Sequence, residues 1–330
     1  MRLQFRQCTE HEGVSTMKVS RRSTLIAAPV LAGLVGCSKV SEEGADYPTD
    51  DLRLIIQADP GGGSDLSSRA LAKEMESELG VSVVPENMPG AAGAIAMEYV
   101  GEQPADGYVI GFCPVEIAML NTTQNADVLP ENYTFIGQIM LAPGVISVAA
   151  DSPYATLEDL IEAGASEALT VGTAGAGSIW EAATLGVNSQ AGTQFSPVPY
   201  DGGAPAVAAA AAGETDAAVS GAGEAIAQGD SVRILGIMHD ETMPDLPDTP
   251  TFAEAIGEDI QFGGWGGIYT AADLPQGVLA TLEAAVRTAV ESDSYQEFQE
   301  NAGNLVVHKD AEEFTTFVQK QFEEFQELLG

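Results

Sequence analysis

The pattern of apolar and polar positions around residue 60 predicts a strand, a tight loop and a helix in succession. Residues 52–58 form a short apolar run, which is typical of a buried strand. Residues 59–63 end this strand, because one proline and three glycines cannot continue it. Apolar side chains then recur at helical spacing from Leu66 to Leu79, and Gly80 is suited to stop the helix.

Strand-like and helix-like segments continue to alternate along the rest of the chain. Further strands are expected at residues 81–85, 108–112, 169–173, 216–220 and 232–238. Further helices are expected from Ala94 and from Ile179, and at residues 204–212, 281–290 and 311–329. Because strands and helices alternate, we expect an α/β protein with a largely parallel sheet.

Two apolar stretches have the composition of connections between two lobes. Residues 141–150 are apolar around Pro143 and Gly144, and suit a crossing from one lobe to the other. Residues 263–269 hold four glycines around Trp265, and we expect them to return to the first lobe.

The N-terminal segment has the pattern of an export signal that ends at a lipidated cysteine. Arg21 and Arg22 resemble a twin-arginine signal, and the apolar core at 25–35 is too short to remain as a membrane span. Small residues before Cys37 resemble a lipobox, with a chance cysteine in a simple signal peptide as the alternative. The polar, acidic residues that follow suit a flexible tether.

Composition and charge exclude several classes of function. Lys and Arg number 13 and Asp and Glu number 49, which gives a formal net charge of -36 and excludes nucleic acid as a partner. The acidic residues are spread along the chain, as in proteins that work in high salt. With only Cys8, Cys37 and Cys113, a disulfide framework is excluded, and we expect Cys113 to be a small core residue.

Patterns of catalytic or metal-binding residues are missing from the sequence. His239 and His308 stand alone, and no His/Cys cluster has metal-ligand spacing. The Gly-x-Gly-Ser motif that ends at Ser178 is not a nucleophile elbow. Leu66 and Trp180 stand where the third glycine of a dinucleotide fingerprint belongs. We therefore expect no cofactor and no catalysis.

Two glycine loops, at residues 60–65 and 173–178, each open a helix. Such loops expose N–H donors at the positive end of a helix dipole, which suits a carboxylate or a phosphate. Two of these N-termini facing across a cleft would hold the two ends of a dicarboxylate. The alternative is a pair of ordinary tight turns in which Ser64, Asp65 and Ser178 only cap their helices.

Five short motifs occur in a fixed order along the chain, and together they are more specific for a protein family than any one of them alone. They are Pro-Gly-Gly-Gly-Ser-Asp at 60–65, Glu-Asn-Met-Pro-Gly-Ala at 86–91, Pro-Ala-Asp-Gly-Tyr at 104–108, Val-Pro-Tyr-Asp-Gly-Gly-Ala-Pro-Ala at 198–206 and Leu-Pro-Asp-Thr-Pro-Thr at 246–251. Together they resemble the substrate-binding proteins of tripartite tricarboxylate transporters, the TctC or Bug family.

The resemblance covers residues 47 to 330 and implies both a fold and a function. The implied fold is two-lobed and periplasmic-binding-protein-like (type II), with a hinge and an interlobe ligand cleft. The implied protein is a monomeric receptor that closes on a small di- or tricarboxylate and delivers it to membrane permease subunits. We expect it outside the cytoplasm, lipid-anchored to the outer face of the cytoplasmic membrane. The expected parts are a signal peptide at 1–37 with Met17 as the true start, a tether at 38–46, a first lobe at 47–148 plus 263–330, and a second lobe at 149–262.

In the family, ligand contact at the two glycine loops is largely through backbone N–H groups, which gives a set of candidate residues here. The candidate ligand-binding residues are Pro60, Gly61, Gly62, Gly63, Ser64, Asp65, Thr173, Gly175, Gly177, Ser178, Tyr200, Ser220 and Trp265. A plain core aromatic is the alternative for Trp265. The chain departs from many family members at Asp59, where they have an apolar residue or proline. A carboxylate there lowers affinity for an anion unless it is turned away or bonds a ligand hydroxyl, amide or water.

Two other functions remain open from the sequence. A solute sensor that presents its ligand to a membrane kinase would use the same binding fold. A small-molecule enzyme on this fold needs a reactive group that the sequence does not offer.

The charge leads to a first prediction about stability. Because exposed carboxylates repel one another less when the Debye length falls to about 3 Å near 1 M salt, the thermal midpoint should fall as salt is removed. Thermal unfolding of the mature chain across a salt series measures this. Full stability in dilute buffer would contradict the prediction.

Overall fold

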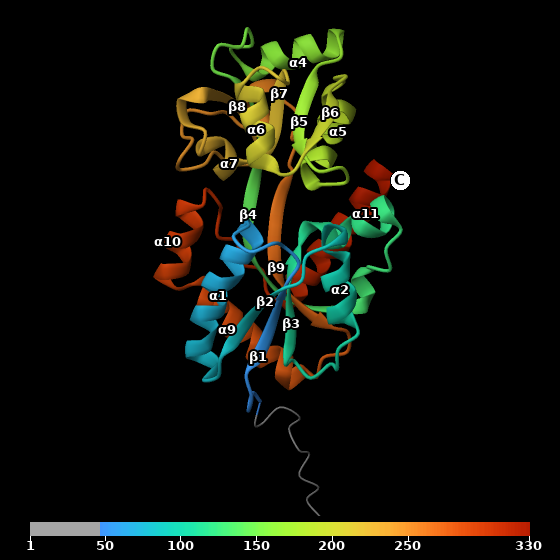
Figure 1. The fold of residues 1–330 in the computed structure, drawn as a ribbon, viewed down its shortest axis with the longest axis vertical. Helices are drawn as coiled ribbons and strands as arrows, with labels where there is room; N and C mark the ends of the chain where they lie inside the picture. The colour runs from blue at the N-terminus through green and yellow to red at the C-terminus, as the bar shows by residue number, and fades with distance from the viewer. Residues whose placement is uncertain (1–46) are drawn as a thin grey trace, which may run out of the picture. The chain divides into compact units, whose positions relative to one another are not determined.

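The computed structural model describes residues 47–330, and Figure 1 shows how their helices and strands are arranged. The expected signal peptide at 1–37, its Cys37 and the tether at 38–46 lie outside the described residues. Within the described part, none of the helices combines the length and the apolar character that crossing a membrane requires.

Two groups of strands, each with its own helices, form the two lobes of this part of the chain (Figure 1). The first lobe holds β1 Leu52–Ile56, β2 Val83–Asn87, β3 Val109–Pro114, β9 Gly263–Ala271, α1 Gly63–Leu79, α2 Ala94–Gly101, α3 Leu120–Gln124, α9 Gln276–Val290, α10 Asp293–Asn301 and α11 Ala311–Leu329. The second lobe holds β5 Thr170–Ala174, β6 Ser196–Tyr200, β7 Ala217–Gly221, β8 Val232–Met238, α4 Leu157–Ser166, α5 Ile179–Ala191, α6 Gly203–Ala211, α7 Ala222–Ile226 and α8 Phe252–Ile256. The long strand β4, Tyr133–Ala149, belongs to both lobes. The expected two-lobed α/β class is confirmed.

The sheet is mixed, so the expectation of a largely parallel sheet was wrong. Its strand order is β2-β1-β3-β9-β4-β7-β5-β6, with β8 also paired to β4. Strands β1, β2 and β3 are parallel to one another, as are β5, β6 and β7. Strands β4 and β9 pair antiparallel with every neighbour they have. The alternation of strands and helices predicts the parallel strands inside each lobe. It does not predict the direction of the strands that pass between the lobes.

Strand β4 changes partners at the place where the sequence predicted a crossing. Up to Pro143, β4 pairs with β9, where Pro143 is opposite Gly263. From Gly144 onward β4 pairs instead with β7 and β8. Gly144 is tightly enclosed, because a Cβ there would lie 2.7 Å from the carbonyl oxygen of Phe262. The Pro143–Gly144 crossing is therefore confirmed.

Both faces of the sheet in the first lobe are covered by apolar helices. The apolar side of α1 packs with α9 on one face, where Leu71, Met75 and Leu282 are fully buried. On the other side, the aromatic stripe of α11 lies in the core, as predicted: the ring of Phe314 is 5.6 Å from that of Trp265. Cys113 is also fully buried, in agreement with its expected role as a small core residue.

The alanine-rich helix α6 packs closely on the sheet of the second lobe. Ala206 and Ala210 are fully buried there. A Cβ on Gly172 of β5 would lie 3.1 Å from the carbonyl oxygen of Ala206, so strand and helix backbones are near contact. Small side chains on both elements allow this approach, and the sequence-based interpretation of α6 as a close-packing helix is confirmed.

The two lobes also touch through backbone at the start of α7. A Cβ on Gly223 of α7 would overlap the carbonyl oxygen of Ala302, and Gly303 is the next residue in contact. Both Ala302 and Gly303 follow α10 in the first lobe. Only a residue without a side chain fits at position 223.

This contact gives a prediction about stability. The substitution Gly223→Ala should lower the free energy of unfolding by about 1–3 kcal/mol, because the added methyl overpacks a backbone contact. Gly175→Ala is the matched control, since nothing lies within 4 Å of its added Cβ, and it should change stability by less than about 1 kcal/mol. Urea unfolding in molar salt measures both variants. Equal stability of the two would show that the lobes are not held together at Gly223.

Candidate ligand-binding site

The first glycine loop connects β1 to α1 and leaves the start of the helix without a side-chain cap. Gly61 has a φ of 87°, in the left-handed region that favours glycine. Gly62 is the N-cap residue and supplies no capping side chain. In residues 47–330, the backbone N–H groups of Gly63, Ser64 and Asp65 have no hydrogen-bond acceptor. Three donors at the positive end of a 17-residue helix are therefore available to an anion.

The alternative roles for Ser64 and Asp65 as helix caps were wrong. The Ser64 hydroxyl accepts a hydrogen bond from Nε2 of Gln57 at 3.1 Å instead. Asp65 is buried, and its carboxylate accepts from the backbone N–H of Gly61 at 2.8 Å. Arg69 and Asn87 also donate to Asp65, each at 2.8 Å. Asp65 therefore holds the loop in its shape and ties it to β2.

These partners decide the ionisation of Asp65. Burial raises the pKa of its carboxyl group, but hydrogen bonds from Gly61 and Asn87, together with the charge of Arg69, lower the pKa below its ordinary value. Because the carboxylate is charged and neutralised locally, it does not need a cation from a ligand.

The second glycine loop connects β5 to α5 and is capped by its own serine. The hydroxyl of Ser178 accepts from the N–H of Glu181 at 3.3 Å and donates to the carbonyl of Ala174 at 2.6 Å. The capping role of Ser178 is thus confirmed. The N–H of Gly177 donates to Oε2 of Glu181 at 2.5 Å. In the described part of the chain, the N–H groups of Ile179 and Trp180 have no acceptor.

Three further features of this loop bear on ligand binding. Thr173 is fully buried, and its hydroxyl has no hydrogen-bond partner within residues 47–330. Gly175 is exposed and has no atom within 4 Å of its Cβ position. A Cβ on Gly177 would lie 3.7 Å from Thr123 of α3, so this loop of the second lobe lies against the first lobe. A shared ligand between this loop and the loop at 60–65 stays a prediction.

The remaining candidate residues lie in different surroundings. Tyr200 is partly buried at the end of β6. Ser220 is fully buried in β7 and donates to the carbonyl of Gly221 at 3.0 Å. Trp265 lies in the aromatic core, and its indole N–H donates to Oε1 of Gln321 at 3.2 Å. Its core role, which the sequence left open, is the one the structure favours, so we keep Trp265 out of the proposed ligand contacts.

Sequence reasoning missed two carboxylates at the ends of strands. Glu116 follows β3, and burial raises the pKa of its carboxyl group. Glu224 follows β7, and its Oε2 accepts from the N–H of Gly221 at 3.0 Å. Burial likewise raises the pKa of Glu224, against the lowering effect of that hydrogen bond. Because the chain has 49 acidic residues, no sequence pattern distinguished these two from the others. Asp59, in contrast, is exposed.

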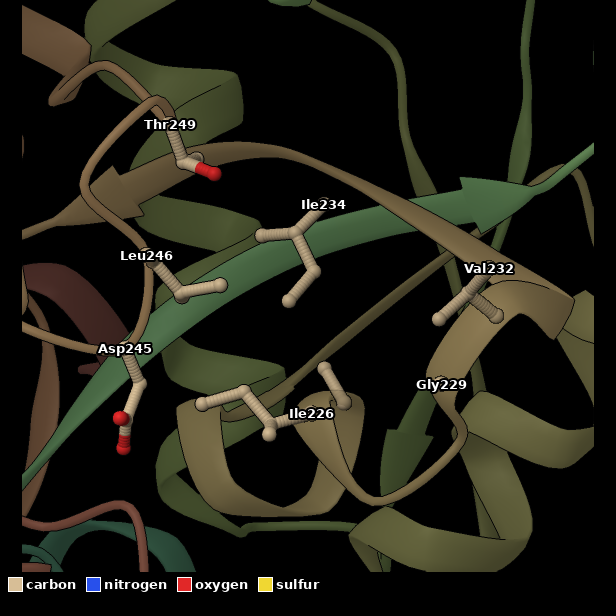
Figure 2. Close-up of a pocket in the computed structure, with 8 residues that line it drawn as sticks. Ile226, Gly229, Val232, Ile234, Asp245, Leu246 and Thr249 are labelled. Atoms are coloured by element: carbon tan, nitrogen blue, oxygen red, sulfur yellow. The ribbon is translucent and has the colours of Figure 1, made fainter.

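The hollow shown in Figure 2 is separate from these loops. It has a volume of about 260 Å³ and lies in the second lobe between α7, β8 and the loop that carries Leu246. Ile226, Val232, Ile234 and Leu246 are apolar residues that line it, and Asp245 lines it as well (Figure 2). None of the candidate ligand-binding residues lines it.

Comparison with known families matches residues 67–329 to the model described as the tripartite tricarboxylate transporter family receptor, TctC. A UPF0065 protein of Agrobacterium vitis is 27% identical over 300 residues, which cover 89% of this chain and 86% of that protein. The protein BugT of Bordetella pertussis is 23% identical over 260 residues, which cover 76% of this chain and 79% of BugT.

Solved structures share the fold. A TctC solute-binding protein from Polaromonas aligns with a TM-score of 0.77 and 25% identity, over 86% of this chain and 98% of that one. MatC from Rhodopseudomonas palustris with bound malate aligns at 0.74 and 23% identity, over 86% and 100%. A protein of R. palustris with adipate aligns at 0.75 and 23% identity, over 86% and 97%.

The hydrogen bonds of Asp65 give a prediction with a defined pH dependence. At pH 7, Asp65→Asn should lower the free energy of unfolding by about 2 kcal/mol, because an amide cannot accept from all three donors. The lowered pKa means that Asp65 stabilises the fold above its unfolded pKa of about 3.9 and loses this effect as pH falls through the folded value. The difference between wild type and variant should therefore shrink below about pH 4.

Urea unfolding in molar salt at a series of pH values measures this difference. Asp248→Asn, at an exposed position, is the control and should match wild type throughout. A constant difference between wild type and Asp65→Asn down to about pH 3 would contradict the assigned role.

Proposed function

This chain belongs to the tripartite tricarboxylate transporter receptor family, and on that premise we propose that it captures a small carboxylate outside the cytoplasm and delivers it to a membrane permease. The observation that carries this proposal is the start of α1, where the N–H groups of Gly63, Ser64 and Asp65 have no acceptor among residues 47–330. These donors follow a parallel strand at its carboxyl end, the usual place of ligand sites in open α/β sheets.

The second loop supplies matching donors in the other lobe. The N–H groups of Ile179 and Trp180 open α5 and also lack acceptors in the described residues. A ligand with two polar ends would bridge the loops at 60–65 and 173–178. The malate and adipate bound to fold relatives are carboxylates of this kind, which supports the same ligand class here.

Binding would work by closure of the two lobes. We place the hinge where β4 changes partners at Pro143 and Gly144 and where β9 begins at Gly263. The lobes are then residues 47–143 plus 263–330, and residues 144–262, whereas the sequence-based expectation put the boundary after residue 148. A ligand that touches both loops stabilises the closed state, because it binds that state more tightly than the open one.

The proposed location and partners of the receptor are based on the N-terminal sequence pattern and on the family. Export by the twin-arginine route and lipidation of Cys37 would hold the receptor at the outer face of the cytoplasmic membrane. The acidic surface suits a salt-rich medium. Partners would be the permease subunits of a tripartite tricarboxylate system, with the receptor as a monomer.

Substitution at Gly62 tests the site. Gly62→Asp should abolish carboxylate binding, because it adds a negative charge and a side chain where the ligand approaches the backbone. Gly62→Ala is the matched control: its Cβ would lie 3.4 Å from the carbonyl oxygen of Asp59, an ordinary contact, so the loop is retained.

A thermal-shift screen in molar salt measures binding, with mono-, di- and tricarboxylates, amino acids and neutral solutes as the ligands. A carboxylate that raises the midpoint of wild type but not of Gly62→Asp supports the proposal. A response only to neutral or cationic solutes would overturn it, as would equal affinity of the two Gly62 variants.

A further inference from the structure

Gln299 of α10 is a buried amide that makes hydrogen bonds at both of its ends. Its Nε2 donates to the hydroxyl of Ser67 in α1 and, at 2.7 Å, to the hydroxyl of Tyr295. Its Oε1 accepts from Nδ2 of Asn304 at 2.9 Å. The side chains of Gln299, Ser67 and Tyr295 lie in residues that are at most 1% exposed. Because both N–H donors and the oxygen of the amide are bonded, the orientation of this side chain is fixed.

The nitrogen end of the amide holds the helix that begins at the proposed anion site. Ser67 lies one turn after Gly63, the first residue of α1. The hydroxyl of Ser67 also lies 3.4 Å from Sδ of Met140 in β4 and 3.4 Å from the hydroxyl of Tyr295. A buried polar network whose members are all bonded permits one arrangement of the elements that it joins. The first turns of α1 are therefore fixed relative to α10 and β4.

The oxygen end of the amide faces the turn that contacts the second lobe. Asn304 donates to Gln299 through its side chain, and the backbone N–H of Asn304 donates to the carbonyl of Gln299 at 2.9 Å. The two residues before Asn304 are Ala302 and Gly303, whose backbone lies against Gly223 of α7. The amide therefore connects the start of α1 to a place where the lobes touch.

The same turn is attached to the strand that crosses between the lobes. Leu305 exchanges two backbone hydrogen bonds with Leu141 of β4, at 2.8 and 2.9 Å. Leu141 lies two residues before Pro143, where β4 changes partners. Gln299 thus lies between the start of α1 on one side and the interlobe contact and the proposed hinge on the other.

We propose that Gln299 is a positioning residue for ligand binding, which acts through Ser67 and Asn304 to hold the start of α1 in place relative to the interlobe contact and the hinge. This inference rests on the proposed function, because it assigns a residue that supports the same site without touching the ligand. A carboxylate bound at α1 favours closure only if α1 is fixed to the elements that join the lobes. Loss of the amide therefore weakens binding.

The alternative role for Gln299 is to pack α10 against α1 and no more. Removal of a purely structural amide would lower the free energy of unfolding and leave the affinity of the folded protein unchanged. Removal of a positioning amide lowers the affinity of molecules that are fully folded. Affinity and stability measured on the same variants therefore distinguish the two roles.

Calorimetric titration of the mature protein in molar salt tests the proposal, with malate, succinate, adipate and citrate as probes. Gln299→Met is the main variant, because methionine has a similar volume but carries neither the amide N–H groups nor the amide oxygen. The fold tolerates this change, since the hydroxyls of Ser67 and Tyr295 keep the partners Met140 and Ile139. The probe that binds the wild type most tightly should bind Gln299→Met about five-fold or more weakly.

Asn304→Ala is a second variant, which keeps the test independent of a buried substitution. Asn304 is partly exposed, and among residues 47–330 its side chain donates to Gln299. This variant should also bind the probe more weakly, and the double variant should bind no more weakly than Gln299→Met alone, because both changes break one connection. Leu79→Ala, at the buried C-terminal end of α1, is the control: it lowers stability but should keep the wild-type affinity. Urea unfolding verifies that every variant is folded during titration.

The outcomes separate the positioning role from the proposed function. Weaker binding by Gln299→Met and Asn304→Ala, with wild-type affinity in Leu79→Ala, supports the role. Wild-type affinity in either of the first two variants overturns the role and leaves the carboxylate receptor standing. An equal loss of affinity in Leu79→Ala also overturns it, since any loosening of α1 would then have the same effect. If none of the four probes binds the wild type, the positioning role fails, and the proposed function fails with it when no other carboxylate binds.

Discussion

The crossing of β4 between the two lobes is the constraint on which the rest of the described structure depends. One strand pairs with β9 as far as Pro143 and with β7 and β8 from Gly144. Proline is tolerated here because the strand changes partners, and glycine is required because the carbonyl of Phe262 lies against it. The parallel strands of the first lobe are joined to β9 through β3, and those of the second lobe are joined to β4 through β7. The positions of both glycine loops therefore depend on the crossing.

In three loops, a backbone N–H group donates a hydrogen bond to a carboxylate in the helix that follows the loop. Asp65 accepts from Gly61, Glu181 from Gly177 and Glu224 from Gly221, in each case three or four residues further along the chain. Each bond fixes a loop but also uses a donor and brings a negative charge close to the proposed anion site. At the starts of α1 and α5, the N–H groups that have no acceptor among residues 47–330 therefore lie next to carboxylates that the loops themselves hold in place.

Local sequence signals were sufficient for most elements but not for their assembly. The glycine at 80 ends α1 in the left-handed conformation as expected, and α11 covers the expected residues, because these features depend on backbone preferences and helical periodicity. The antiparallel strands were missed, since direction is decided by contacts far apart in sequence. Asp65 was interpreted as a cap for the same reason: Asn87, which holds it, lies 22 residues away. Glu224 resembled every other acidic residue until its burial was known.

Burial also decides which of the many carboxylates keep their interactions in salt. Salt screens exposed charges within a few ångströms, so in a concentrated medium the acidic surface contributes little to the attraction or repulsion of a solute. Partly buried charges are screened much less. Asp65, which is buried and accepts hydrogen bonds from Gly61, Arg69 and Asn87, keeps its interactions under conditions in which the surface charge is screened. The loop that opens α1 is therefore held in place within a protein whose net charge is -36.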